Sequence, residues 1–414
     1  MTRSNIRLRN GVAAAAAAGL LIVPSAAGNA WSTASAPVTS TAVSPARTDP
    51  PSPSPTPGFP ELTPAVSRQL DRAVRQVMRE AGVPGVTVGL WTPGKGSYVR
   101  AFGTADKASG APMSTGLNMR VGSVTKTFTV TALLTLVDRG EVGLDDPIGR
   151  YVKGVPDGDR ITLRDLAGMR SGLFNYSMDP DFFKALTSDP RRPFTPQELL
   201  AYSFGHPVQF RPGEKFEYSN TNAILLGLVV EKVSGLPLAE YLERNVFGPA
   251  GMHHTFLPRG TEFPAPHAQG YTDQTANGRT QNATDWNPSW AWAAGGAVSD
   301  QRDLRVWARV LATGTLLTPA TQAERLKTGP SGLPDTGYGL GVFDVHGWIG
   351  HNGSLPGYES LVVYLPETRT TLVVLLNTDT DYRGSEPSTL FGEAITRIVT
   401  PQHVYTLPAQ PTGR

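Results

Sequence analysis

The sequence predicts an α/β domain in which one antiparallel β-sheet is flanked by helices and a mainly helical subdomain is inserted at about residues 150–290. Two pairs of strand-type runs support this fold class, one near each end of the body: residues 86–91 with 97–102, and residues 358–365 with 370–376. Each pair is joined by a short segment containing Gly or Pro, which indicates a hairpin. The long stretch between the pairs is rich in helix-type and loop-type sequence, and this places the insertion there.

Helices are expected at both ends of the body, beside the strands. Residues 64–81 predict an amphipathic helix with one apolar face for the sheet. The apolar positions on that face are Leu70, Val74, Val77 and Met78. A second helix is predicted near residues 390–399, after the last strand pair. Strands and helices from both chain ends would thus build one sheet and its covering layer.

Composition divides the chain into four segments. Residues 1–30 begin with arginines, continue into an alanine-rich apolar core too short to span a bilayer, and end in small residues, as a signal peptide does. Residues 31–60 form a Pro/Ser/Thr-rich linker of extended character. The body covers 61–400, and 401–414 is a C-terminal tail. We therefore expect a secreted, extracellular protein. Cell-wall association and an uncleaved, tethering leader stay open as alternatives.

Charge and cysteine content exclude several classes of partner. The net charge is +2 and there is no cysteine, so a lipoprotein anchor, a disulfide framework and a thiol nucleophile are excluded. Charges of both signs are mixed, which gives no case for nucleic acid or membrane-surface binding. We expect no membrane span after signal cleavage. The sequence also lacks metal-ligand spacings and phosphate-loop patterns. We expect no metal, no cofactor and a monomer.

Three short motifs carry the chemistry, and they occur in a fixed order. They are Ser123-Val-Thr-Lys126, Tyr218-Ser-Asn220 and His351-Asn-Gly353. Each alone is a weak signal. Together they supply a nucleophile, proton carriers and a strand edge for a substrate, as in penicillin-recognising enzymes.

The first motif has the spacing that activates a serine. A serine hydroxyl needs an adjacent base at neutral pH, and positions i and i+3 of a helix share one side. Lys126 therefore points to Ser123 if a helix begins there. The following apolar run, residues 127–138, predicts burial, and burial lowers a lysine pKa. A bare N-cap role for Ser123 is the simpler alternative.

The second and third motifs are predicted at a helix entrance and on a strand. Tyr218 precedes an apolar helical run, where Ser and Asn are also ordinary capping residues. Gly353 would let another backbone approach the strand closely. His351, taken alone, is equally typical of a strand-end histidine with no catalytic duty.

With these motifs the chain resembles the serine β-lactamase-related family, which includes class C β-lactamases, related esterases and soluble secreted D-alanyl-D-alanine carboxypeptidases. The resemblance spans roughly residues 62–400 and includes a Tyr-Gly-Leu-Gly run at 338–341. It implies the β-lactamase/transpeptidase-like fold. The pairing of Tyr-Ser-Asn with His-x-Gly resembles the carboxypeptidase branch most.

The resemblance also implies roles for individual residues. Ser123 would be the acylated nucleophile, Lys126 its partner and Tyr218 the general acid/base. His351 would assist at the far wall. The implied substrate-binding residues are Asn220 at a substrate amide, Trp290 lining the cleft, Asn352 and Gly353 of the third motif, and Ser354, whose N–H would complete an oxyanion hole.

One departure concerns the substrate. Carboxypeptidases of this branch resemble one another in an arginine just after Tyr-Gly-Leu-Gly, where it binds the terminal carboxylate. Here Val342 and Phe343 follow that run, and no Arg or Lys occurs before Arg369. Arginine is the natural bidentate partner of a carboxylate. Recognition of a free D-alanine carboxylate is therefore not expected from this segment.

Two classes of function remain from the sequence. The first is a secreted serine hydrolase that forms a covalent acyl-enzyme: a carboxypeptidase acting on peptidoglycan peptides, a β-lactamase-family esterase or a β-lactamase. The second is a non-hydrolytic protein that binds peptidoglycan or penicillin. The expected ligand is accordingly a small molecule or peptide: a stem peptide, an ester or a β-lactam. Because all catalytic roles are filled, we expect an enzyme.

Overall fold

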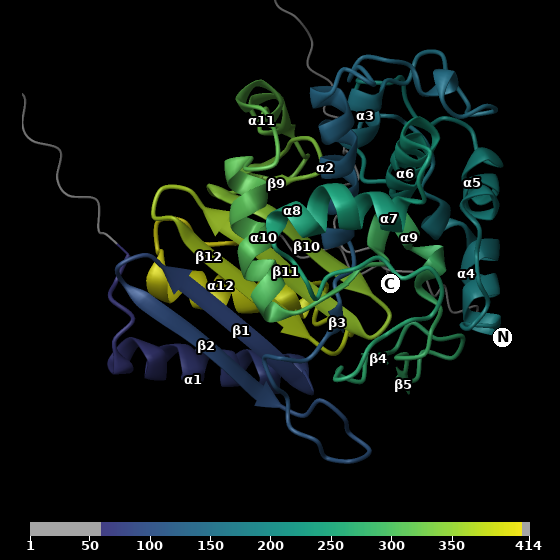
Figure 1. Cartoon of the computed structure of the whole chain (residues 1–414). Helices are drawn as coiled ribbons and strands as arrows, with labels where there is room; N and C mark the ends of the chain where they lie inside the picture. The colour runs from purple at the N-terminus through teal and green to yellow at the C-terminus, as the bar shows by residue number, and fades with distance from the viewer. Residues whose placement is uncertain (1–58, 408–414) are drawn as a thin grey trace, which may run out of the picture. The chain divides into compact units, whose positions relative to one another are not determined.

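The computed structural model describes residues 59–407 (Figure 1). The predicted signal peptide, most of the predicted linker and the last seven residues of the predicted tail lie outside the described residues. Eight strands form one antiparallel sheet in the order β2-β1-β12-β11-β10-β9-β8-β7. The fold class predicted from the sequence is thus confirmed.

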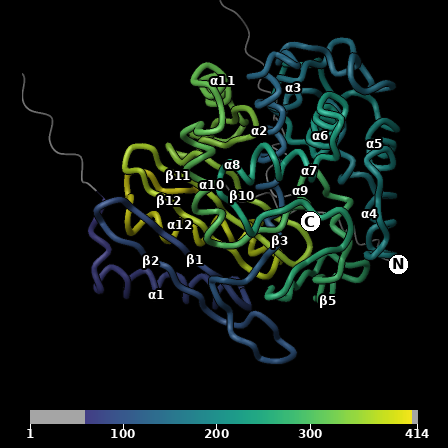
Figure 2. The backbone as a smooth tube through the Cα atoms, in the orientation of Figure 1, coloured from purple at the N-terminus to yellow at the C-terminus, as the bar shows by residue number. Residues whose placement is uncertain are grey.

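The main sheet joins the two ends of the body. Its strands are β1 Gly85–Thr92, β2 Gly96–Gly103, β7 Gly329–Pro330, β8 Thr336–Tyr338, β9 Phe343–Val345, β10 Trp348–Leu355, β11 Tyr358–Leu365 and β12 Thr370–Leu376. β1 pairs with β12, and Figure 2 shows the early strand β1, in blue, beside the late strands in yellow. Two short ladders lie outside the sheet: β3 Met119–Arg120 with β6 Val298–Ser299, and β4 Tyr271–Thr272 with β5 Gln281–Asn282.

Helices cover both faces of the sheet and fill the insertion. They are α1 Pro64–Ala81, α2 Val124–Asp138, α3 Leu163–Ala167, α4 Pro180–Ser188, α5 Pro196–Phe204, α6 Asn220–Ser234, α7 Leu238–Leu242, α8 Gly248–Ala250, α9 Trp292–Gly295, α10 Gln301–Thr313, α11 Pro319–Arg325 and α12 Pro387–Val399. Of the residues described, no single helix is long and apolar enough to cross a membrane. Only the bent pair of α6 with Leu238–Ala250 reaches that length and composition.

Alternation along the strands explains the two layers of core. Along β12, Val373 and Leu375 pack with α2 and α10, whereas Leu372 and Val374 pack with α1 and α12. Side chains of successive strand residues point to opposite faces, so an all-apolar strand is buried on both. The predicted helix at 64–81 and the four predicted strands match α1, β1, β2, β11 and β12 within one residue at each end.

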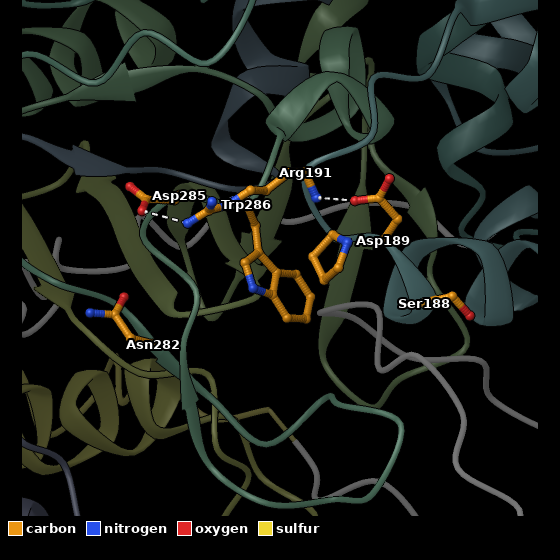
Figure 3. A pocket seen from close by; sticks show the side chains of 7 residues that line it. Ser188, Asp189, Arg191, Asn282, Asp285 and Trp286 are labelled. Atoms are coloured by element: carbon orange, nitrogen blue, oxygen red, sulfur yellow. Dashed lines mark hydrogen bonds and ion pairs between the residues drawn. The ribbon is translucent and has the colours of Figure 1, made fainter.

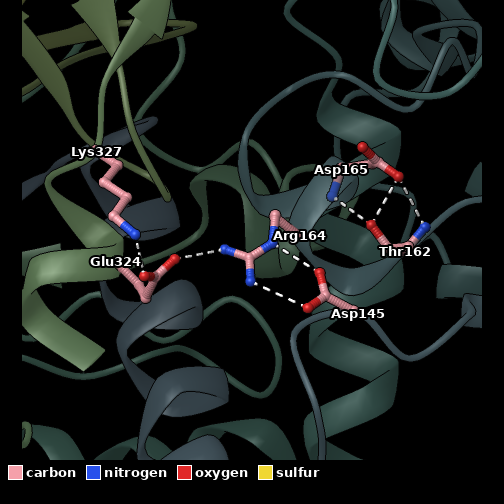
Figure 4. A network of polar contacts seen from close by, with 6 residues as sticks. All are labelled: Asp145, Thr162, Arg164, Asp165, Glu324 and Lys327. Carbon is pink, nitrogen blue, oxygen red and sulfur yellow. Dashed lines mark hydrogen bonds and ion pairs between the residues drawn. The ribbon is translucent and has the colours of Figure 1, made fainter. Parts of the chain in front are cut away.

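The predicted insertion at about 150–290 is helical, and in this fully described stretch the only strands are the two-residue β4 and β5. Polar contacts tie its first helix to α11 (Figure 4). Arg164 of α3 lies 2.8 Å from Asp145 and 2.9 Å from Glu324 of α11. Thr162 and Asp165 form a capping box at the start of α3. These ion pairs are partly exposed, and each contributes little energy. They connect α3 of the insertion to Asp145 and to α11, which lie outside the insertion.

Part of the predicted C-terminal tail packs against the body. Tyr405 is fully buried, and its backbone N–H donates to Thr396 Oγ1 of α12 at 2.8 Å. The indole of Trp348 donates to the His403 carbonyl at 2.7 Å. The packed body therefore continues past residue 400 to at least Tyr405.

Candidate active site

Ser123 stands immediately before α2, at a turn that only glycine can make. Gly122 has φ +53°, and a Cβ added there would lie 2.6 Å from the Ser354 backbone nitrogen. Gly353 is equally constrained, because its Cβ would lie 2.1 Å from the Val121 carbonyl oxygen and 2.8 Å from the Ser123 nitrogen. Strand β10 therefore lies directly against the serine turn. This contact brings the backbones of Ser123 and Ser354 together, as an oxyanion hole requires.

Lys126 lies one turn along α2 and points back to Ser123. Its Nζ is 2.9 Å from Ser123 Oγ and donates to the Ala294 carbonyl at 2.7 Å. The side chain is fully buried, and no carboxylate bonds to Nζ within the described residues. Burial lowers the pKa of Lys126 well below its usual value. The amine is thereby favoured in its neutral form, which can accept a proton from the serine.

Tyr218 ends the loop before α6 and completes this group. The Lys126 Nζ lies 4.9 Å from the centre of the Tyr218 ring. The Tyr218 hydroxyl is buried and makes no well-formed hydrogen bond within the described residues. Burial raises the pKa of Tyr218 well above 10; the nearby Tyr338 and Glu386 raise it further, and the adjacent Ser123 hydroxyl opposes the rise. Tyr218 is therefore protonated at neutral pH, as a proton donor must be.

His351 forms the far wall of the site, inside an aromatic cluster. Its ring centre is 6.0 Å from that of Tyr218, 6.1 Å from that of Tyr338 and 4.9 Å from that of Phe343. Burial lowers the pKa of His351 to about 3; protonation of Lys126 would lower it further, and the hydrogen bond with the Asn352 backbone opposes the fall. The imidazole is neutral near pH 7. It cannot act as a cation for a substrate carboxylate.

A narrow pocket opens beside Ser123, and Tyr218 is not among the residues that line it. Three predicted substrate-binding residues line it: Asn220, Trp290 and Ser354. The other lining residues are Ser123, Tyr176, Ala291, Ala294, Gly295 and Leu355. Most of the pocket wall is apolar or aromatic. No charged side chain is among the lining residues, so the pocket offers an acyl group apolar contacts and no counter-charge.

Asn352, also predicted to bind substrate, is not part of that pocket. Its side chain is 1% exposed, and its Nδ2 donates to Glu386 Oε2 at 2.6 Å. Phe343 follows the Tyr-Gly-Leu-Gly run, where an arginine would be expected in a carboxypeptidase, and it is 1% exposed. Its ring packs edge-on against Tyr338, with centres 4.5 Å apart. The third motif is thus split: Gly353 and Ser354 face the nucleophile and Asn352 faces α12.

Several residues of the site were not among the sequence predictions. Tyr176 donates its hydroxyl to the Trp290 carbonyl at 2.6 Å, and Asn220 Nδ2 donates to Ser177 Oγ at 3.0 Å. Tyr338 lies 3.5 Å from His351 Nε2. Only Tyr338 had a sequence signal, as the first residue of Tyr-Gly-Leu-Gly. Nothing in the local sequence of Tyr176 or Ser177 indicates that they reach the site.

A larger hollow lies elsewhere, at the end of α4 (Figure 3). Arg191 and Asp285 form an exposed ion pair of 3.1 Å across it, and Trp286 lines it. None of the predicted catalytic residues lines this hollow. Within residues 59–407, no group of three or more His, Asp or Glu side chains is placed to hold a metal ion.

Comparison with known proteins gives a family and close structural relatives. The Beta-lactamase family matches residues 70–390. A D-stereospecific amidohydrolase from Streptomyces sp. aligns with a TM-score of 0.70 and 29% identity, covering 81% of this chain and 98% of that one. The D-amino acid amidase of Ochrobactrum anthropi SV3, in complex with L-phenylalanine amide, aligns with a TM-score of 0.70 and 31% identity, covering 81% and 96%.

Curated relatives are more distant. Protein flp of Staphylococcus aureus (strain N315) is 24% identical over 332 residues, which is 78% of this chain and 65% of that protein. The chain spans just under two thirds of the length of these curated relatives, 66% of the putative penicillin-binding protein PbpX of Bacillus subtilis (strain 168) and 65% of protein flp. The match therefore concerns the shared domain.

Proposed function

The chain belongs to the β-lactamase family of serine hydrolases, and from this premise we propose that it hydrolyses amides of D-amino acids through an acyl-enzyme on Ser123. The observation that carries the proposal is the buried Lys126 amine, 2.9 Å from Ser123 Oγ. The proposed substrate class draws on the names of the two structural relatives, an amidohydrolase and an amidase that are 29% and 31% identical. The apolar pocket beside Ser123 supports an apolar side chain on the acyl part.

In the proposed reaction Ser123 Oγ attacks the amide carbonyl while its proton passes to neutral Lys126. The oxyanion is stabilised by the backbone N–H groups of Ser123 and Ser354. Tyr218 gives its proton to the departing amine and is reprotonated through Lys126. The C–N bond breaks and an ester forms on Ser123. A water molecule then attacks that ester while its proton passes to neutral Lys126; the acyl–oxygen bond breaks, and Lys126 returns the proton to Ser123 Oγ as the acid leaves.

A D-alanyl-D-alanine carboxypeptidase is the second candidate, favoured by the Tyr-Ser-Asn and His-x-Gly motifs. Against it stand the neutral His351 and the buried Phe343, which leave the expected carboxylate clamp without a cation. Esters with apolar acyl groups would also fit the pocket. The leader at 1–30 supports the accompanying proposal that the enzyme is exported, to act outside the cell or at the cell wall.

The test uses D-phenylalanine amide and a fluorophosphonate probe. The native protein should release ammonia from the D-amide faster than from the L-amide and take up the probe on Ser123, as seen by intact and peptide mass. Ser123→Ala should lose both activities. Ser97→Ala, at an exposed serine of β2, should keep both. Probe uptake that persists in Ser123→Ala would contradict the assigned nucleophile, and faster cleavage of D-Ala-D-Ala peptides than of amides would favour the second candidate.

A further inference from the structure

The pocket beside the nucleophile is lined in part by helix α9, which is tied to the proposed base. Ala294 and Gly295 of α9 line the pocket. Lys126 Nζ donates to the Ala294 carbonyl at 2.7 Å, and Thr129 Oγ1 of α2 donates to the Ala293 carbonyl at 2.8 Å. A shift of α9 would therefore disturb Lys126, so this part of the lining is fixed by the catalytic geometry.

Two aromatic residues, Tyr176 and Trp290, also line the pocket. They come from separate short helices, Tyr176–Met178 and Pro288–Trp290. The Tyr176 hydroxyl donates to the Trp290 carbonyl at 2.6 Å, so the two residues are joined to each other. The position of this aromatic pair depends on the side chains that pack behind it, because protein interiors are close-packed.

Phe182 of α4 packs behind both members of the aromatic pair. Its ring centre lies 5.3 Å from that of Tyr176, nearly perpendicular at 85°, and 6.0 Å from that of Trp290. Phe194 and Tyr202 of α5 surround the same ring at 5.5 Å and 5.6 Å. Rings at these separations stabilise one another through edge contacts. Phe182 is fully buried and does not itself line the pocket, so it can act on a substrate only through the aromatic pair.

We propose that Phe182 is a positioning residue that limits the size of the side chain on the acyl part of a substrate, by holding Tyr176 and Trp290 in place. This proposal rests on the proposed function, because it presumes that the acyl group occupies the pocket beside Ser123. Removal of the Phe182 ring leaves space into which the aromatic pair can relax, and the pocket then widens. Because α9 stays tied to Lys126, the change should affect the choice among substrates and not the chemical step.

The test compares a small and a large acyl group, D-alanine amide and D-tryptophan amide, by kcat/KM. Phe182→Leu keeps the position apolar and should shift the ratio of the two values toward D-tryptophan amide by about tenfold, the scale on which an apolar pocket discriminates by size. The kcat for D-alanine amide should change by less than about threefold, because the nucleophile and base are untouched. Phe183→Leu is the matched control. Phe183 is the next residue of α4, is half-buried and makes no ring contact with Tyr176 or Trp290 within residues 59–407, so the ratio should stay unchanged.

A second variant covers the case in which circular dichroism shows that Phe182→Leu does not fold. Tyr202 is half-buried and packs on Phe182, so Tyr202→Leu loosens the same support at less cost in stability and should shift the ratio in the same direction by a smaller factor. An unchanged ratio in the folded Phe182→Leu protein, or in Tyr202→Leu where Phe182→Leu is unfolded, would overturn the proposal. An equal shift in Phe183→Leu would also overturn it. Absence of probe uptake at Ser123 in the native protein would instead overturn the proposed function beneath it.

Discussion

Lys126 and His351 are both basic, both fully buried, and both part of one site, yet their surroundings differ. The Lys126 amine has two polar partners, Ser123 Oγ and the Ala294 carbonyl, within 2.9 Å. His351 is surrounded by aromatic rings, and its two ring nitrogens face other groups: Nε2 lies 3.5 Å from the Tyr338 hydroxyl and Nδ1 lies 2.5 Å from the Asn352 carbonyl oxygen. Burial lowers the pKa of each. One neutral base is directed at the nucleophile, and the other is part of an apolar wall.

The difference indicates that proton transfer and substrate selection reside in separate elements. The start of α2 carries the nucleophile and its base, and α2 is buried on nearly every side. Strand β10 carries the wall, whose character is set by rings from other elements that pack on His351: Phe343 from β9 and Tyr338 from β8. Substitutions at the start of α2, and at Gly353 where β10 lies against it, should therefore change rates for all substrates. Substitutions of the wall side chains His351 and Phe343 should change which substrates are used.

The largest effect is expected on the proton-transfer side. Lys126→Ala and Tyr218→Phe should each lower kcat/KM for D-phenylalanine amide by about a hundredfold or more, as loss of a general base or acid does. Because the two act as one unit, the double variant should be little worse than the poorer single variant. Steady-state kinetics on all three variants, with circular dichroism to verify folding, measure this. Fully multiplicative effects would contradict a shared role.

A charged substitution in the wall around His351 should lower the stability of the folded protein before it changes the activity. Phe343→Arg places a guanidinium where the ring is 1% exposed and packed on Tyr338 and His351. Burying an unpaired charge there should lower the free energy of unfolding by about 3 kcal/mol or more. Phe343→Leu, which keeps the site apolar, should cost less. Urea denaturation of the three proteins compares them; an unchanged midpoint for Phe343→Arg would show that the wall can open to solvent.

The nucleophile side was predictable from the sequence because its geometry is local. Ser123 and Lys126 are three residues apart, and an apolar run follows them, so one buried helix brings both groups together. The long strands were predictable for the same reason, because a mostly apolar run such as residues 370–376 indicates a strand that is buried on both faces. The position of Tyr218 before a helix was also predicted and is confirmed.

The wall was not predictable, because it depends on contacts between distant segments. Asn352 and Glu386 are 34 residues apart, and they meet only because α12 begins beside β10. The three-residue strands β8 and β9 are too short to show alternation, so the packing of Tyr338 and Phe343 on His351 left no local pattern. Their register comes from pairing in the completed sheet.

A pH titration of stability tests the buried histidine. The pKa of His351 falls from about 6.5 to about 3 in the folded state. Between these values the unfolded chain binds a proton that the native state does not, so this residue makes stability fall as pH drops from about 6.5 toward 3. His351→Gln should flatten the curve of unfolding free energy over that window relative to the native protein. Parallel curves would show that His351 is not held neutral.

The smallest effect on kcat/KM is expected from substitution of the Ser354 side chain, and a small effect would support the oxyanion role of its backbone N–H. If strand β10 stabilises the oxyanion through the backbone N–H of Ser354, alanine keeps that group and loses only a hydroxyl. Ser354→Ala should then retain kcat/KM for D-phenylalanine amide within about threefold, whereas removal of an oxyanion donor costs about a hundredfold or more. The matched change is Gly353→Ala, whose Cβ would lie 2.1 Å from the Val121 carbonyl and push β10 away from Ser123. That variant should lose most of its activity while Lys126 and Tyr218 are intact. A large loss in Ser354→Ala would mean that the hydroxyl contacts the substrate.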